Sequence, residues 1–189
     1  FDSRLPKANG DIWTVACDGP GLECTKPVRV TDHADADVLP NWSRDGQHLY
    51  FASRRSGSWQ LWRTNASGAA SPAVQLSTDG GYFAMESGDG KWLYYSRLEP
   101  PDVAGLWRRP LDGKIPFDSP GELVLPLERS STATWNVCGE EVFYQTFFHR
   151  SLGPLARTEI SAFNLRNRQS RRVVPDGVSK ISRGLAVPV

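Results

Sequence analysis

Three glycines place most of this 189-residue chain in one repeating register. Gly46, Gly90 and Gly139 lie 44 and 49 residues apart, and a short apolar triplet begins three residues after each of them. The triplets are Leu49–Phe51, Leu93–Tyr95 and Val142–Tyr144. A glycine directly after an aspartate, as in Asp45-Gly46, supplies the positive φ that a tight hairpin turn needs. Each copy is therefore predicted to contain a strand, a tight turn and a second strand.

A third and a fourth strand complete each copy. The best copy predicts strands at 39–42, 48–52 and 60–64, and the apolar pair of its third strand, Leu61-Trp62, recurs elsewhere. The recurrences are Ile12-Trp13, Leu106-Trp107 and, in weaker form, Ile160 with Phe163. Fourth strands are predicted at 28–31, 74–77, 123–127 and 172–174. Four strands per repeat at this spacing are typical of β-propeller blades, and the 3.6-residue periodicity of helical repeats is not visible.

The predicted fold is therefore all-β, a partial β-propeller of about four blades that is incomplete at both ends. The predicted divisions of this one domain are a partial first blade (1–31), three blades (32–77, 78–127 and 128–177) and the first strand of a following blade (178–189). The incomplete blades at the two ends would expose apolar sheet faces and unpaired strand edges to water. We expect them to be covered by further blades of a longer protein, by another copy, or by the terminal strand packing beside the first partial blade.

The best copy resembles the TolB-like, WD-related propeller repeat, whose blades read P-x-W-S-P-D-G before an apolar strand. Pro40, Trp42, Ser43, Asp45 and Gly46 match this pattern. Three residues depart from it: Arg44 replaces the proline, Glu86 replaces the tryptophan of the second copy, and Cys138 replaces the aspartate of the third. The resemblance implies a propeller of the kind carried by large bacterial sensor or regulator proteins and by prolyl-oligopeptidase-like enzymes.

One loop and one tryptophan are the candidates for binding. Asp32, His33, Asp35 and Asp37 precede the first strand of the second blade, where such loops open onto one mouth of the ring. Carboxylates in this pattern suit a cation or a basic segment of a protein partner, but the spacing is not that of a calcium loop, so no metal site is assigned. Asp37 is expected to face the channel. Trp59, within the polar loop SGSWQ, either contacts a partner or packs one blade against the next.

No catalytic residue or cofactor is assigned. The chain lacks a G-x-S-x-G elbow and a phosphate-binding glycine loop, and turn geometry explains its Asp-Gly pairs. The formal net charge of +1 gives no field that would attract nucleic acid, and Arg166, Arg168, Arg171 and Arg172 are interpreted as charges that protect a sheet edge. No apolar run is long enough to insert this segment in a membrane.

Cys17 and Cys24 flank a predicted hairpin tip and are either bridged or two free thiols. A disulfide would indicate a periplasmic or other extracytoplasmic location, whereas free thiols would fit the cytoplasm. The expected function is a non-catalytic module that binds a protein partner or a ligand through loops at one mouth of the ring. The alternatives are the gating propeller of a serine hydrolase or peptidase and the sensory domain of a membrane-tethered transcriptional regulator.

Overall fold

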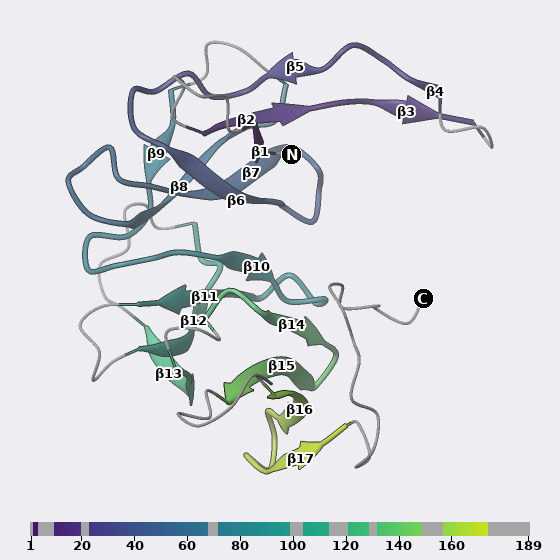
Figure 1. Cartoon of the computed structure of the whole chain (residues 1–189), viewed down its shortest axis with the longest axis vertical. Coiled ribbons are helices and arrows are strands. Elements are labelled where there is room, and N and C mark those ends of the chain that lie inside the picture. The colour runs from purple at the N-terminus through teal and green to yellow at the C-terminus, as the bar shows by residue number, and fades with distance from the viewer. Residues whose placement is uncertain are drawn as a thin grey trace. The chain divides into compact units, whose positions relative to one another are not determined.

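The computed structural model describes residues 2–3, 10–19, 23–67, 72–98, 104–113, 121–128, 132–148 and 157–173 (Figure 1). The regular elements within these ranges are all β-strands, so the all-β prediction is confirmed. The described residues contain no helix that could cross a membrane. The predicted strand at 178–189 lies outside them. The chain forms two compact units, 1–133 and 134–189, which are taken separately below.

The described part of the first unit contains three larger sheets and one two-stranded ribbon, all with antiparallel pairing. The first sheet joins β1 (Asp2–Ser3), β2 (Asp11–Thr14) and β5 (Val28–Arg29), and a two-stranded ribbon of β3 (Cys17–Asp18) and β4 (Glu23–Cys24) lies between β2 and β5 in sequence. The second sheet, called blade two, is formed by β6 (Asp37–Trp42), β7 (His48–Ser53), β8 (Gln60–Asn65) and β9 (Val74–Gln75). The third, called blade three, is formed by β10 (Ala84–Glu86), β11 (Trp92–Arg97), β12 (Gly105–Pro110) and β13 (Glu122–Pro126).

The second unit has one sheet of the same kind. Its strands are β14 (Trp135–Cys138), β15 (Glu141–Phe148), β16 (Arg157–Asn164) and β17 (Ser170–Arg172), paired antiparallel in sequence order. The described chain therefore holds three four-stranded meanders and one three-stranded sheet, which is the arrangement of a partial β-propeller.

A serine and an aspartate close the turn between the first two strands of blades two and three. The Ser43 hydroxyl donates a hydrogen bond to Asp45 at 2.7 Å, and the same carboxylate accepts one from the backbone N–H of Gln47 at 3.0 Å. In blade three the Ser87 hydroxyl donates to Asp89 at 2.6 Å. Gly46 and Gly90 both have a φ of 70°, a left-handed conformation that costs glycine little. The S-x-D-G motif thus fixes where each hairpin turns.

The apolar core lies between successive sheets of the first unit. Leu49 and Phe51 of β7 pack with Ile12 of the first sheet, whereas Tyr50, between them, packs with Leu93 and Tyr95 of blade three. Alternate side chains of one strand therefore reach both neighbouring sheets. This explains why the triplet is apolar throughout instead of alternating with polar residues.

Strand β6 begins two residues earlier than predicted and contains a β-bulge. Its pairing with β7 shifts between Val38 and Asn41, and Leu39 adopts a left-handed φ of 54°. Pro40 falls inside the bulge, where its missing N–H costs no ladder hydrogen bond. As a result, Asp37 at the start of β6 lies opposite Ser53 at the end of β7.

Candidate functional site at the two ends of blade two

Asp37 forms a buried ion pair at the end of blade two where β6 begins and β7 stops. Its side chain has no exposed surface, and both of its carboxylate oxygens accept hydrogen bonds from Arg55 Nη2, at 2.8 and 2.6 Å. The Arg55 guanidinium also lies 4.9 Å from the ring centroid of Trp62. The expectation that Asp37 faces an open channel is therefore replaced by a structural role, because a carboxylate this deeply enclosed needs a cationic partner. The pair ties the 32–37 segment to the 54–59 loop.

Blade three has a related brace. Arg97 Nη2 donates to the backbone oxygen of Asp79 at 2.8 Å and lies 3.4 Å from its carboxylate. The guanidinium is 4.5 Å from the ring centroid of Trp107, close enough for a cation–π interaction. At this end of each blade, an arginine near the end of the second strand binds an aspartate. In blade two, Arg55 binds Asp37 at the start of β6, and in blade three, Arg97 binds Asp79, which precedes β10. We call this the braced end.

His33 and Asp35 are exposed residues of the segment that ends at the braced Asp37. The backbone N–H of Asp35 donates to His33 Nδ1 at 3.0 Å, and the Asp35 carboxylate is 3.7 Å from the same nitrogen. Both side chains are exposed. Among the residues described, no three His, Cys, Asp or Glu side chains are grouped to hold a metal ion. The structure therefore separates the acidic run into one buried member, Asp37, and an exposed loop.

Trp59 is partly buried at the braced end and contacts the segment leading into blade three. Its ring meets that of Tyr82 edge to face, with centroids 5.2 Å apart, and the Arg54 guanidinium lies 5.0 Å from the Trp59 centroid. The backbone N–H of Tyr82 donates to the oxygen of Ser96, on β11. Of the two roles considered for Trp59, this geometry fits a contact between blades that keeps part of the indole on the surface.

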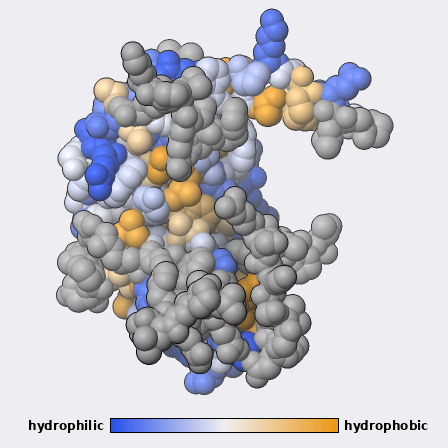
Figure 2. All heavy atoms as spheres, in the orientation of Figure 1, coloured by the Kyte–Doolittle hydropathy of each residue, from blue (hydrophilic) through white to orange (hydrophobic). Residues whose placement is uncertain are grey.

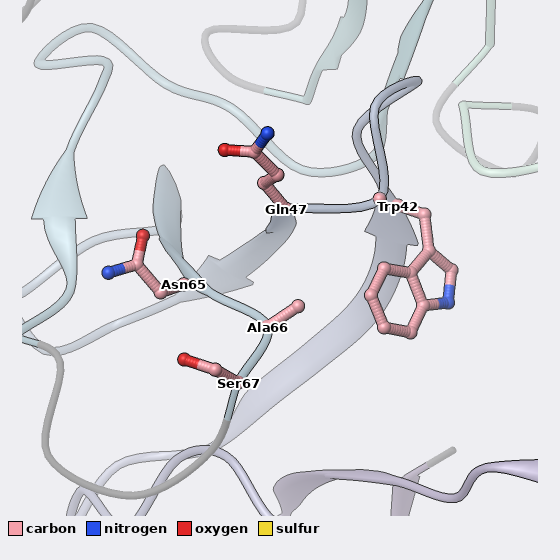
Figure 3. Close-up of a pocket in the computed structure, with 6 residues that line it drawn as sticks. Trp42, Gln47, Asn65, Ala66 and Ser67 are labelled. Carbon is pink, nitrogen blue, oxygen red and sulfur yellow. The ribbon is translucent and has the colours of Figure 1, made fainter.

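The opposite end of blade two contains a hollow that sequence reasoning missed. It has a volume of about 480 Å³ and is lined by Trp42, Gly46, Gln47, Asn65, Ala66 and Ser67 (Figure 3). Trp42 is 49% exposed, although Trp135, which also lies four residues before its turn glycine in sequence, is only 2% exposed. A smaller hollow of about 180 Å³ shares Trp42 and is lined also by Trp13, Val15 and Pro40 among other residues. A tryptophan that recurs at the same offset in two repeats is expected to be a core residue. The sequence alone therefore did not indicate a site at Trp42.

The walls of the larger hollow are held by the backbone. The N–H of Ala66 donates to the oxygen of Gln47 at 2.9 Å, which joins the segment after β8 to the turn before β7. The Asp45 carboxylate fixes the other side of that turn through the N–H of Gln47. The pKa of Asp45 is lowered, because its carboxylate accepts hydrogen bonds first from the Ser43 hydroxyl and then from Gln47.

The arginine cluster of the second unit is matched by carboxylates. Arg171 Nη2 lies 2.7 Å from Glu141, Arg166 Nη2 lies 2.5 Å from Glu140, and Arg172 contacts Glu159. A basic patch that attracts phosphate groups needs positive charge that is not neutralised locally. Three of the four arginines are therefore in ion pairs with carboxylates of this sheet, and the Arg168 guanidinium lies 5.9 Å from the ring centroid of Phe163.

Cys17 and Cys24 are joined by a disulfide across the exposed ribbon of β3 and β4. Figure 1 shows this ribbon continuing beyond β2 and β5 as an arm. Val15 and Val28 at its base are 43% and 48% exposed, and Figure 2 shows hydrophobic and hydrophilic residues mixed along it. Cys138, in the second unit, is a free and exposed thiol.

Comparison with curated proteins gives a partial match only. No family model matches the chain. An uncharacterized protein of Agrobacterium fabrum is 31% identical over 80 residues, which is 42% of this chain and 26% of that protein. The chain thus spans well under two thirds of this relative's length.

Comparison with solved structures shows the fold. The chain is similar to TolB from Acinetobacter baumannii, with a TM-score of 0.59 and 19% identity over 90% of this chain and 38% of that one. A TolB candidate from Agrobacterium tumefaciens gives 0.61 and 15% identity, over 92% of this chain and 59% of the other. A puromycin-hydrolyzing peptidase from Mycobacterium tuberculosis gives a TM-score of 0.60 and 15% identity, over 95% of this chain and 27% of the peptidase. Together with the stacked four-stranded meanders, these similarities show that the chain has the TolB-like β-propeller fold.

Proposed function

We propose that this chain is a non-catalytic β-propeller module that binds a protein partner through the braced end of blade two. The observation that carries the proposal is the buried Asp37–Arg55 pair, which anchors the end of the 32–37 segment that holds the exposed His33 and Asp35. A buried ion pair is costly to desolvate and is weak evidence for stability by itself. Here it fixes two loops in one geometry, and a fixed loop loses less conformational entropy when it binds.

The chemistry of the braced end fits a basic, extended segment of a partner. Asp32 and Asp35 offer exposed carboxylates, and Trp59 beside Tyr82 offers a partly covered aromatic surface. Partly enclosed aromatic residues beside charged groups are typical of interface hot spots. The exposed carboxylates would mainly raise the association rate and make binding sensitive to salt.

The Cys17–Cys24 disulfide supports a periplasmic or other extracytoplasmic location for this module, because structural disulfides persist in oxidising compartments. Further blades of the same protein, or another copy, would supply the remaining sheets of a closed ring. The chain covers only 38% of the Acinetobacter TolB structure, which leaves room in such a ring for sheets beyond those described.

A peptide selection tests the binding proposal. A random peptide library displayed on phage would be selected on the immobilised chain, and enriched peptides measured by calorimetry at low and high salt. We expect basic sequences with one or more apolar residues, bound through the braced end. Replacing His33 and Asp35 together, or Trp59 alone, with alanine should weaken binding by about tenfold or more, as loss of a hot-spot contact does.

Trp42→Ala is the matched control, because Trp42 lines the hollow at the other end of the same blade. Selection of acidic peptides, or binding that survives both braced-end variants, would contradict the proposal. Circular dichroism of each variant separates loss of binding from loss of fold.

The similarity to a peptidase structure supports a second candidate function, the propeller domain of a hydrolase. In that case the reaction would belong to parts of the protein outside this chain. The sequence of the parent gene decides between the two: a G-x-S-x-G elbow in an α/β-hydrolase pattern beside this segment would favour the hydrolase.

A further inference from the structure

The hollow beside Trp42 combines an exposed indole with neutral polar side chains. Gln47, Asn65 and Ser67 are exposed, Ala66 is partly buried, and no described residue lining the hollow is charged (Figure 3). Tryptophan is usually buried to a large extent, yet about half of Trp42 is in contact with solvent. This composition differs from that of the braced end, where charged groups dominate.

We propose that this hollow binds a neutral saccharide, with the Trp42 indole as the stacking platform. The C–H groups on one face of a pyranose ring are apolar and carry slight positive charge, so they complement the electron-rich face of an indole. Sugar hydroxyls both donate and accept hydrogen bonds, as do the amides of Gln47 and Asn65 and the hydroxyl of Ser67. The absence of charge among the described lining residues favours a neutral sugar over an anionic one.

The size and rigidity of the hollow suit this ligand. Its volume of about 480 Å³ lies within the range of small-molecule sites, roughly 300–1,000 Å³. The hydrogen bond from Ala66 N–H to the Gln47 oxygen and the Ser43–Asp45 turn hold the walls in place before a ligand arrives. Trp42 lies on a strand and not in a loop, because it is the last residue of β6 and pairs with Leu49. A platform on a strand is positioned more precisely than one on a loop.

The saccharide site is independent of the proposed function, because it lies at the end of blade two opposite the braced end. The test is a glycan array carrying neutral and anionic glycans, probed with the biotinylated chain on streptavidin so that several copies add avidity. Glycans that bind would then be measured by saturation-transfer NMR against the chain, together with maltotriose, cellotriose and triacetylchitotriose as defined probes. We expect neutral glycans to be retained, with little change between low and high salt.

Four variants locate the binding. Trp42→Ala should weaken the affinity for a retained glycan by about tenfold or more, because stacking and apolar burial are both lost. Trp42→Tyr should recover most of it, since an aromatic face remains. Asn65→Ala should weaken binding, and Trp59→Ala should leave it unchanged. The recovery by tyrosine is a result that a merely structural role for Trp42 would not require.

The inference would be overturned if no neutral glycan is retained, if anionic glycans are preferred with strong salt dependence, or if Trp42→Ala binds as well as the parent chain. Capture of basic peptides that depends on Trp42 but not on Trp59 would also overturn it, by making this hollow a peptide site. The Trp59→Ala variant distinguishes the two proposals, since it impairs peptide binding at the braced end only.

Discussion

The backbone N–H of Arg44 donates a hydrogen bond to the side chain of Glu86, at 3.1 Å from Oε2. Arg44 belongs to the turn of blade two and Glu86 is the last residue of β10 in blade three, so the bond joins two sheets. Both residues depart from the TolB-like repeat, which has proline at the first position and tryptophan at the second. A proline has no N–H to donate. The two departures are therefore physically linked, since one Glu86 oxygen accepts from an N–H that the usual proline lacks, while the other accepts from the Tyr50 hydroxyl at 2.7 Å.

The link predicts that the effect of Arg44→Pro on the free energy of unfolding depends on the residue at position 86. Position 44 follows Ser43 in a turn closed by Gly46 N–H to the Ser43 oxygen, where proline is well tolerated and restricts the unfolded chain. By itself, that restriction stabilises the folded protein by about 0.4–1 kcal/mol. In the parent chain Arg44→Pro should be destabilising overall, because the N–H bond to Glu86 and the guanidinium bond to the Gly88 oxygen are both lost. In a Glu86→Ala background it should be less destabilising, because only the guanidinium bond to the Gly88 oxygen is then lost. Urea unfolding of the four proteins measures this, and equal effects in both backgrounds would contradict the link.

Removing one partner of the Asp37–Arg55 pair should be costly. Asp37→Ala leaves a largely buried guanidinium without its counter-charge, and such a change typically costs about 3–5 kcal/mol. Replacing both residues with leucine should cost less than the single change, because no unpaired charge remains. Asp35→Ala, two residues away and exposed, should stay within about 0.5 kcal/mol of the parent chain and serves as the control. Denaturant unfolding monitored by tryptophan fluorescence measures all three variants. A mild effect of Asp37→Ala would mean that the carboxylate reaches water and could still contact a ligand.

The repeat register predicted the all-β propeller fold because turn chemistry and apolar strands are local properties of the sequence. The Asp-Gly pairs at 45–46 and 89–90 close the same hairpin in two repeats, and a strand covered on both faces is apolar throughout. The bulge at Leu39 was not predictable, since it depends on how β6 meets β7. That local shift extends the strand back to Asp37.

The candidate sites were harder to predict because exposure depends on neighbouring sheets. Asp35 and Asp37 are the same residue type two positions apart in one acidic run. Nevertheless, Asp35 is exposed, whereas Asp37 is buried against Arg55. Trp42 and Trp135 both lie four residues before the turn glycine, but Trp42 ends β6 opposite Leu49 whereas Trp135 begins β14 opposite Tyr144, and they are 49% and 2% exposed. Repeat position thus identifies the element on which a residue lies. It does not show whether another residue covers the side chain.

The S-x-D-G turns predict a loss of stability in acid. Hydrogen bonds from Ser43 and Ser87 lower the pKa of Asp45 and Asp89 below that of an ordinary aspartate side chain. A carboxyl whose pKa is lower in the folded state stabilises the fold above its unfolded pKa, and this contribution disappears as the pH falls through the folded value. Stability should therefore decline below about pH 4. The double variant Asp45→Asn, Asp89→Asn should show a shallower decline, measured by urea unfolding between neutral pH and pH 2. An unchanged slope would assign the acid sensitivity to other carboxyls.

The Cys17–Cys24 disulfide should stabilise only the exposed arm and not the core of blade two. Cys17 and Cys24 face each other across β3 and β4, where the described residues are exposed and no core lies beneath them. Reduction should therefore speed hydrogen exchange near the hydrogen bond from Thr25 N–H to the Ala16 oxygen. The amides of β7 and β8, which lie in the core of blade two, should keep their protection. Thiol titration of the unreduced, denatured chain should find one reactive cysteine, Cys138. Finding three thiols would remove the support for an oxidising compartment, and loss of protection in β7 after reduction would show that the arm supports the sheet instead of extending from it.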